Sequence, residues 1–194
     1  GMILRDDLQL IYDWVPEGSR VLDLGCGDGE LLSALVAHKQ CSGYGVEIDT
    51  DSVIAAIGRG VNVIQADLEQ GLLAFGDHSF DVIVLSQTIQ AMQNTETILQ
   101  DLTRVAGQAI VSFPNFGYWR NRLQIALLGH MPVSERMPYQ WYNTPNIHLC
   151  TLQDLDRLSA TNNIRVLERA VMTGRQRVDT LPNLLGSLAF YRVG

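Results

Sequence analysis

Asp23-Leu24-Gly25-Cys26-Gly27-Asp28-Gly29 follows directly after the apolar stretch Arg20-Val21-Leu22, and its three glycines stand on alternate residues. Glycine at every second position allows sharp turns with positive φ and removes side chains that would keep a ligand away from the main chain. A helix that begins after such a loop points its first amides at the ligand. The stretch therefore predicts a strand, a nucleotide-binding loop and a helix, in that order.

The length and composition indicate one domain with a sizeable core, because the chain has 194 residues and is 46% hydrophobic. We therefore expect residues 1–194 to form a single domain. The formal net charge is −7, from 14 basic and 21 acidic residues. Since an acidic surface repels phosphate backbones and anionic lipids, we expect neither nucleic acid nor a membrane as a partner.

The three cysteines, Cys26, Cys41 and Cys150, have neither the spacing of a disulfide framework nor that of a zinc site. We therefore expect no bound metal and a reducing, cytoplasmic location. No apolar run approaches the roughly 20 residues that are needed to cross a bilayer.

Short apolar runs alternate with helical patterns over much of the chain. Strands are predicted at residues 21–24, 44–48, 61–64, 82–85 and 109–113, and helices at residues 3–15, 31–37, 52–57 and 97–105. In the first helix, Leu4, Leu8, Ile11 and Val15 form one apolar face. The alternation is typical of an α/β protein with a parallel sheet and helices on its faces.

Residues 114–150 break this alternation. They contain four prolines and six of the fourteen aromatic residues, with no clear period, so we expect an irregular insert or a lid. A helix at residues 151–160 follows, where Thr151 and Asp154 resemble a capping box with Asp in place of Glu. Extended stretches at 164–172 and 188–193 complete the pattern.

The glycine spacing also bears on the choice of nucleotide. A dinucleotide-binding loop would carry a third glycine where this chain has Glu30, which disfavours NAD. Glu47 stands at the end of the second predicted strand, 22 residues after Gly25. A carboxylate there can accept hydrogen bonds from both ribose hydroxyls in either class of cofactor.

The pattern Asp-x-Gly-x-Gly-x-Gly resembles motif I of class I methyltransferases, and the stretches at 43–49, 65–68 and 79–87 resemble later motifs of that family. The resemblance implies a Rossmann-like fold with a seven-stranded, mainly parallel sheet whose last strand is antiparallel. It implies S-adenosylmethionine or S-adenosylhomocysteine as the cofactor. The binding residues are then Asp23, Gly25, Cys26, Gly27, Gly29, Glu47, Ile48, Asp67, Leu68, Ser86 and Gln87.

The chemistry of this cofactor agrees with the pattern, because it carries a carboxylate and an ammonium group but no pyrophosphate. Loop amides can bind the carboxylate, and Asp23 can meet the ammonium directly or through water. In the resemblance, Asp67 accepts from the adenine amino group, and Ser86 and Gln87 lie beside the methionine portion. Each carboxylate also has a structural alternative: Asp23 or Asp67 as a turn residue or helix cap, and Glu47 as a solvated strand end.

The methyl-acceptor side is less defined. An in-line displacement from a sulfonium mainly requires an acceptor held at roughly 3 Å, with a base only for a protonated acceptor. Candidate bases or acceptor ligands are His148, Tyr142, Tyr139 and His130, and His148 also fits a hydrogen-bonded structural histidine.

Other residues of the 114–150 segment have open alternatives. Phe116, Tyr118, Trp119, Tyr139, Trp141 and Tyr142 either line a pocket or form the core of a lid. Arg120 and Arg122 either grip a carboxylate or are surface charges. Asn-Pro-Pro-Tyr is absent after the fourth predicted strand, which argues against an amino-group DNA methyltransferase.

Nearly the whole chain resembles the MetW family of bacterial methionine-biosynthesis proteins, most specifically at residues 21–29, 112–119 and 141–151. The resemblance implies a role beside homoserine O-acyltransferase, and a homodimer is compatible with it. Two hypotheses follow. The chain is either an accessory protein that binds the cofactor and supports or regulates the acyltransferase, or a methyltransferase of a small molecule or protein side chain. The undefined acceptor side favours the first.

Overall fold

A central eight-stranded sheet organises the computed structural model, which describes residues 4–194. The strand order is β3-β2-β1-β4-β5-β8-β6-β7. The strands are β1 (Arg20–Leu24), β2 (Ser42–Glu47), β3 (Val63–Gln65), β4 (Phe80–Ser86), β5 (Ala106–Pro114), β6 (Val166–Thr173), β7 (Gln176–Arg177) and β8 (Leu188–Val193). Strands β1 to β5 pair in parallel, and β8 is antiparallel to both β5 and β6. The predicted α/β class, the mainly parallel sheet and the antiparallel last strand are thus confirmed.

The strand count differs from the sequence prediction of seven. Each predicted strand is present, and β7 is additional. It comprises two residues that pair with Met172 and Thr173 at the end of β6. A strand this short has no alternating hydrophobic pattern, so it could not be predicted from the sequence.

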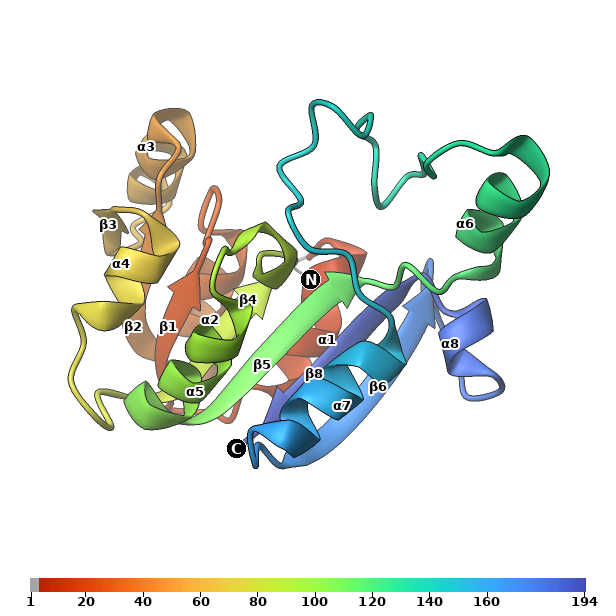
Figure 1. Cartoon of the computed structure of the whole chain (residues 1–194). Helices are drawn as coiled ribbons and strands as arrows, with labels where there is room; N and C mark the ends of the chain where they lie inside the picture. The colour runs from red at the N-terminus through yellow and green to blue at the C-terminus, as the bar shows by residue number, and fades with distance from the viewer. Residues whose placement is uncertain (1–3) are drawn as a thin grey trace.

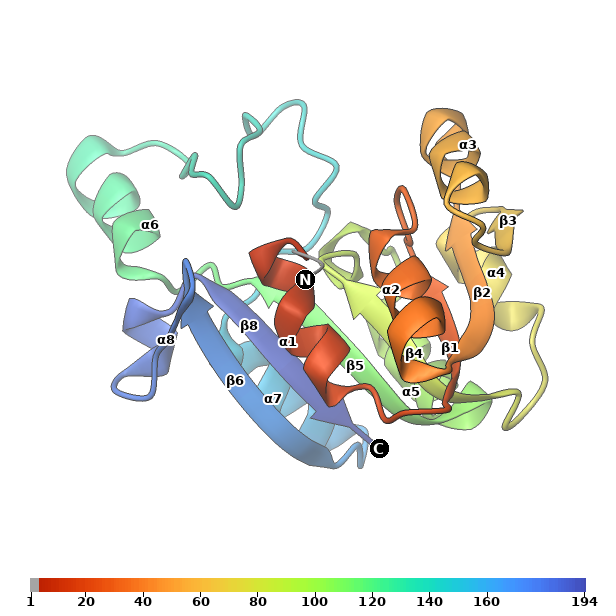
Figure 2. The ribbon, with the colours of Figure 1, turned by 180° about the vertical axis from the view of Figure 1, so that it is seen from behind.

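Helices cover both faces of the sheet (Figures 1 and 2). On one face lie α1 (Asp6–Trp14), α2 (Glu30–Lys39) and α3 (Thr50–Gly58). On the other lie α4 (Leu68–Leu73), α5 (Thr95–Val105) and α7 (Leu152–Thr161). Because successive strand residues point to opposite faces, Val21 and Val82 pack against the first set while Leu22 and Ile83 pack against the second.

The first helix docks as its pattern predicted, with Leu4, Leu8, Ile11 and Val15 all buried. It begins at Asp6 rather than at residue 3, which lies outside the described residues. The ammonium of Lys39, the one lysine in the sequence, donates to the carbonyls of Tyr12 at 2.6 Å and Val15 at 2.8 Å. A cation bound to the last carbonyls stabilises the helix end.

The remaining elements are short. Besides α4, the sequence did not predict the 3₁₀ turn η1 (Ile89–Ala91), α6 (Trp119–Leu123), the π-helical turn η2 (Gln124–Leu128) or α8 (Pro182–Leu185). The capping box at α7 is confirmed: Thr151 N–H donates to Asp154 Oδ2 at 2.9 Å, and the Thr151 side chain accepts from Asp154 N–H. None of the helices within residues 4–194 has the length and apolar content to cross a membrane.

One hydrogen bond ties the antiparallel strand to α7. The fully buried Tyr191 of β8 donates its hydroxyl to Asp156 Oδ1 at 2.9 Å. We expect Tyr191→Phe to lower the free energy of unfolding by about 1–2 kcal/mol, because it removes a part-buried bond to a charged group. The matched control is Tyr44→Phe at an exposed tyrosine of β2, expected to stay within about 0.5 kcal/mol. Urea denaturation measures both, and equal effects would contradict the assignment.

Candidate functional site

The candidate site lies where the carboxyl ends of β1, β2 and β4 meet. Strand β1 pairs with β2 on one side and β4 on the other, which places Asp23 level with Gly45 and Val84. The strand order reverses here, because the chain passes from β1 to β2 in one direction and later returns to β4 on the opposite side. Ligands of open α/β sheets bind in the crevice at such a point.

The glycine-rich loop leaves β1 through left-handed backbone, with φ of +81° at Gly25, +54° at Gly27 and +77° at Gly29. Gly25 N–H donates to the carbonyl of Val46 at 2.8 Å and so holds the loop against β2. A Cβ at Gly25 would lie 2.4 Å from Thr88 Cγ2, whereas a Cβ at Gly27 would meet no described atom within 4 Å. Packing therefore requires glycine at 25, while Gly27 borders open space.

Cys26 is buried between these glycines and has a packing role. A Cβ on Gly45 of β2 would lie 2.4 Å from the Cys26 Sγ, so the two residues fit only because one lacks a side chain. Burial, then the negative charges of Asp23 and Glu47, raise the pKa of the Cys26 thiol to about 12. A buried thiol with a raised pKa is mostly protonated at neutral pH and is a poor nucleophile.

Asp23 is a buried carboxylate at the floor of the site, with 2% of its surface exposed. Its Oδ1 has no hydrogen-bond partner among the residues that the structure describes. Burial raises the pKa of Asp23 to about 7; the charge of Glu47 adds to the rise and that of Arg5 opposes it. Since an unpaired buried carboxylate is costly, a cationic group in the crevice would bind favourably here.

Glu47, at the end of β2, is held by backbone amides. Its Oε2 accepts from Gly27 N–H at 3.0 Å, and its Oε1 accepts from Ile48 N–H at 2.9 Å and Asp49 N–H at 3.0 Å. Glu47 thus links the glycine-rich loop to β2, a contact that the sequence did not predict. A carboxylate has about four lone-pair sites, so a ribose diol would have to share or replace some of these amides.

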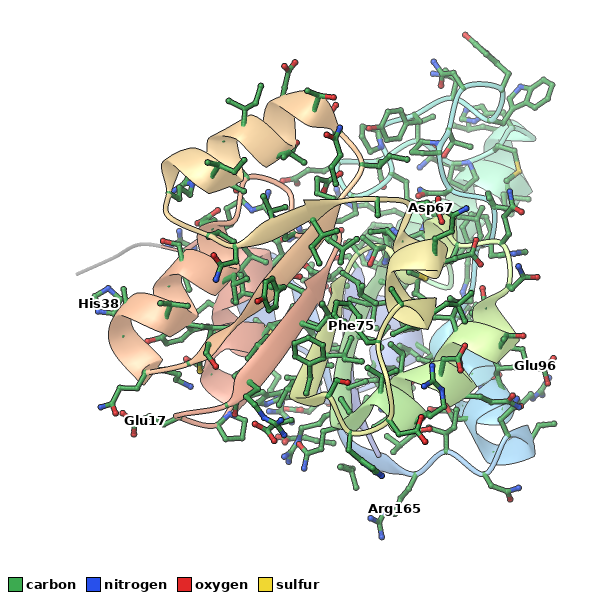
Figure 3. All side chains as sticks on the ribbon, turned by 90° about the vertical axis from the view of Figure 1, so that its left-hand side faces the viewer. Glu17, His38, Asp67, Phe75, Glu96 and Arg165 are labelled. Atoms are coloured by element: carbon green, nitrogen blue, oxygen red, sulfur yellow. The ribbon has the colours of Figure 1, made fainter. Side chains whose placement is uncertain are left out.

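Asp67 lies at the same end of the sheet, opposite Glu17 and Arg165 (Figure 3). It caps α4, accepting from Glu69 N–H at 3.0 Å, so the alternative of a helix cap is present. Leu68 Cδ1 would lie 3.5 Å from a Cβ on Gly25, which places its side chain beside the glycine-rich loop. Ile48 is exposed at the end of β2.

Ser86 and Gln87 follow the end of β4. Ser86 Oγ is buried without a partner among the described residues. Gln87 has φ of +52°, and its backbone N–H donates to the Ser112 carbonyl at 3.0 Å. Its side-chain amide donates to Asp7 Oδ2 at 2.8 Å, which connects α1 to the end of β4.

The sequence analysis missed the first turn of α1 as part of this region. Asp7 is buried, and Arg5 N–H donates to Glu30 Oε1 at 3.0 Å at the start of α2. A signal was available: Asp7 stands three residues after Leu4, on the apolar face of its helix. A charged residue at such a position is buried only when it is paired.

The two histidine candidates for the acceptor side each lie beside a backbone carbonyl. His148 Nε2 lies 3.1 Å from the carbonyl of Gln93, and the ring lines a cavity of about 480 Å³ beside α5 and α7. Asp23, Glu47 and Ser86 do not line that cavity. His130 Nδ1 lies 3.0 Å from the carbonyl of Met131.

Four of the six aromatic residues of the 114–150 segment are exposed, namely Trp119, Tyr139, Trp141 and Tyr142, whereas Phe116 and Tyr118 are partly buried. Much of the segment extends beyond the sheet (Figures 1 and 2). The two arginines have partners within the segment: Arg122 Nε donates to the Gly117 carbonyl at 2.5 Å, and the Arg120 guanidinium lies 5.4 Å from the ring centroid of Trp119.

Comparison with known protein families shows the family to which this chain belongs. The model of the family described as methionine biosynthesis protein MetW matches residues 5–193. The chain belongs to the MetW family. A curated relative from Rhodopirellula baltica, the bifunctional methionine biosynthesis protein MetXA/MetW, is 36% identical over 97% of this chain. The MetW-family chain spans 33% of that relative's length.

Solved structures share the fold of this MetW-family chain. A methyltransferase from Mesorhizobium loti, described as S-adenosylmethionine dependent, has a TM-score of 0.71 at 15% identity and matches 97% of each chain. A possible histamine N-methyltransferase from Thermotoga maritima has a TM-score of 0.69 at 20% identity, with 97% of this chain and 86% of that chain covered. The class I methyltransferase fold expected from the sequence is confirmed.

The buried carboxylate of this MetW-family chain predicts a particular dependence of stability on pH. The pKa of Asp23 is raised in the fold, so the native state holds a proton that the unfolded chain has lost, and stability falls as pH rises from about 4 to about 7. We expect Asp23→Asn to remove this loss. The free energy of unfolding of the Asp23→Asn variant, relative to that of the unaltered chain, is expected to increase by on the order of 1 kcal/mol per pH unit over that range and then to stay constant.

Urea denaturation of both proteins at pH 4.5, 6 and 8 measures the effect. A difference between the two that is the same at all three pH values would show that Asp23 ionises in the folded protein as it does in the unfolded chain.

Proposed function

We propose that this chain binds S-adenosylmethionine or S-adenosylhomocysteine at the carboxyl edge of its sheet, and that it supports or regulates homoserine O-acyltransferase in the cytoplasm. The observation that most supports this choice of ligand is the buried Asp23 carboxylate beside the glycine-rich loop, one oxygen of which has no partner among the described residues. A nucleoside with an amino-acid ammonium group would supply the missing partner.

Residues around the same edge of the sheet could bind the other groups of the ligand. The amides of the loop and of the first turn of α2 can bind the carboxylate. Glu47 would accept from the ribose hydroxyls, and Asp67 would accept from the adenine amino group through its second oxygen. Leu68 and Ile48 supply apolar surface for the ring, and Ser86 Oγ, buried without a described partner, lies by the methionine portion with Gln87.

The start of α2 disfavours a dinucleotide. Glu30 is its first residue, and Asp28 lies in the preceding loop, where its Oδ1 accepts from Glu30 N–H at 3.2 Å. A pyrophosphate at this helix end would meet two carboxylates, which pair with Arg59 at 2.7 Å and with Arg5 at 3.6 Å. A ligand with one carboxylate and one ammonium group brings less negative charge to the same place.

The roles of the chain's own residues are binding and orientation. When bound, S-adenosylmethionine supplies an electrophilic methyl group on a sulfonium. Asp23 would fix the ammonium, and Glu47 would fix the ribose while keeping the loop closed on β2 through Gly27. The 480 Å³ cavity that contains His148 is lined by other residues, so no side chain of this set is assigned as a base.

The acyltransferase partner is supported by the Rhodopirellula relative, whose name joins MetXA to MetW in one protein. Two parts joined in one chain stay at a high effective concentration, which favours their contact. For a bound ligand to regulate such a partner, it must bind the activating and inactive states with different affinity. The methyltransferase-like neighbours support the alternative, an active methyltransferase, through the fold alone.

Glu47 offers the most direct test of ligand placement. Glu47→Ala removes charged hydrogen bonds to the ribose and is expected to weaken S-adenosylhomocysteine binding by about 2 kcal/mol, or roughly 30-fold. Because Glu47 also holds three amides, melting of the unliganded variant is recorded beside the calorimetric titration. The control is Asp51→Ala in the first turn of α3. Unchanged affinity in a folded Glu47 variant would refute this placement.

The partner is tested with purified homoserine O-acyltransferase. We expect the two proteins to co-purify, and the rate of acyl transfer to change when this chain is added and again when S-adenosylmethionine is added. No complex and no change in rate would exclude the accessory role. Release of S-adenosylhomocysteine with candidate acceptors measures the methyltransferase alternative.

A further inference from the structure

The segment beyond β5 exposes an unusual amount of apolar surface. We call residues 119–149 the arm, which extends past the carboxyl edge of the sheet (Figures 1 and 2). Eleven of the 21 exposed large apolar residues of the described chain lie in it. They are Trp119, Leu123, Ile125, Leu127, Leu128, Met131, Tyr139, Trp141, Tyr142, Ile147 and Leu149.

The arm's helix is oriented with its apolar face outward. Trp119, Leu123 and Leu127 are spaced by four residues along α6 and η2, and all three are exposed. Asn121, on the opposite side, is buried, and its amide donates to the Asn115 carbonyl at 3.3 Å. A helix of a monomeric protein normally turns such an apolar stripe toward the core.

Polar groups of the arm, in contrast, form hydrogen bonds with other residues of the same chain. Gln124 forms a pair of hydrogen bonds with the backbone of Val133, at 3.1 and 3.2 Å. Near its far end, Ile147 and His148 N–H both donate to the Gln90 carbonyl at 2.9 Å. The arm is therefore fixed at several points while its apolar side chains face solvent.

The summed exposed surface of these residues is comparable to that of a stable interface. Eleven large apolar residues at roughly half exposure together present on the order of 1,000 Å². The largest apolar patch on a typical monomer is about 300–600 Å², and a standard interface uses about 800 Å² per partner. Tryptophan and tyrosine are also the side chains most enriched at interface hot spots.

The charge of the arm indicates the kind of partner surface. The arm has three basic residues, Arg120, Arg122 and Arg136, and one acidic residue, Glu135. Its formal net charge is therefore +2. The whole chain carries −7, so the remainder carries −9. A partner surface with an apolar centre and an acidic rim would complement the arm.

We infer that the arm is the surface that docks homoserine O-acyltransferase, through an apolar centre and an acidic rim on the acyltransferase. The inference rests on the proposed function for the identity of the partner. The Rhodopirellula relative supports this occupant over a second copy of the chain, because its name places a MetXA part in the same protein as the MetW part.

The test compares two double variants in the full chain. Leu127→Ser with Trp141→Ser alters arm residues that are 74% and 72% exposed; Ile57→Ser with Leu73→Ser alters residues of α3 and α4 that are 60% and 65% exposed. Titration calorimetry measures the affinity of each for the purified acyltransferase. We expect the arm variant to bind at least 30-fold more weakly and the control variant to bind within about threefold of the unaltered chain.

The other outcomes separate this inference from the proposed function. If the unaltered chain does not bind the acyltransferase, the proposed function fails. If it binds and the arm variant binds equally well, the docking surface is wrong. Sedimentation and S-adenosylhomocysteine titration complete the test. If the arm substitutions convert a homodimer to a monomer, the arm is a self-association surface and the assignment is overturned. If they abolish binding of the nucleoside ligand, the arm is a lid and the assignment is likewise overturned.

Discussion

Parallel pairing of β1 with β2 on one side and β4 on the other is the constraint on which the site depends. Parallel strands must end at the same edge, so Asp23, Glu47 and Ser86 are gathered there although they come from three separate strands. Covering both faces with helices completes the arrangement, because a parallel sheet buries both of its faces. The glycine-rich loop can then approach β2 closely, since Gly45 leaves room for Cys26.

The sequence predicted the parts of this arrangement that depend on local pattern. Apolar runs located the seven longer strands, and the spacing of Gly25, Gly27 and Gly29 located the loop. Sequence patterns could not predict contacts between distant residues, such as the hydrogen bond from Gln87 to Asp7, which are 80 positions apart. Short elements such as α4 and β7 were missed because two to six residues are too few to show a period. The orientation of Glu47 toward three amides also depends on the folded loop.

Aromatic content proved ambiguous in the sequence for a physical reason. Trp141 and Tyr142 suit a core, a pocket or an interface equally well, because each offers a large apolar body with a polar group at its edge. Only the folded position of the arm distinguishes these uses. The carboxyl edge of the sheet is rich in oriented polar groups, whereas the arm is rich in exposed apolar ones. We propose the first surface for the nucleoside ligand and the second for the acyltransferase.

The backbone of Gln87 has a further consequence. A residue other than glycine in the left-handed region costs about 1–2 kcal/mol, and here it is maintained by Ser112, Asp7 and Gln90, which come from β5, α1 and η1. Gln90 in turn binds the backbone of Ile147 and His148 at the end of the arm. One residue with positive φ therefore lies in a hydrogen-bond network that includes β5, α1 and, through Gln90, the far end of the arm.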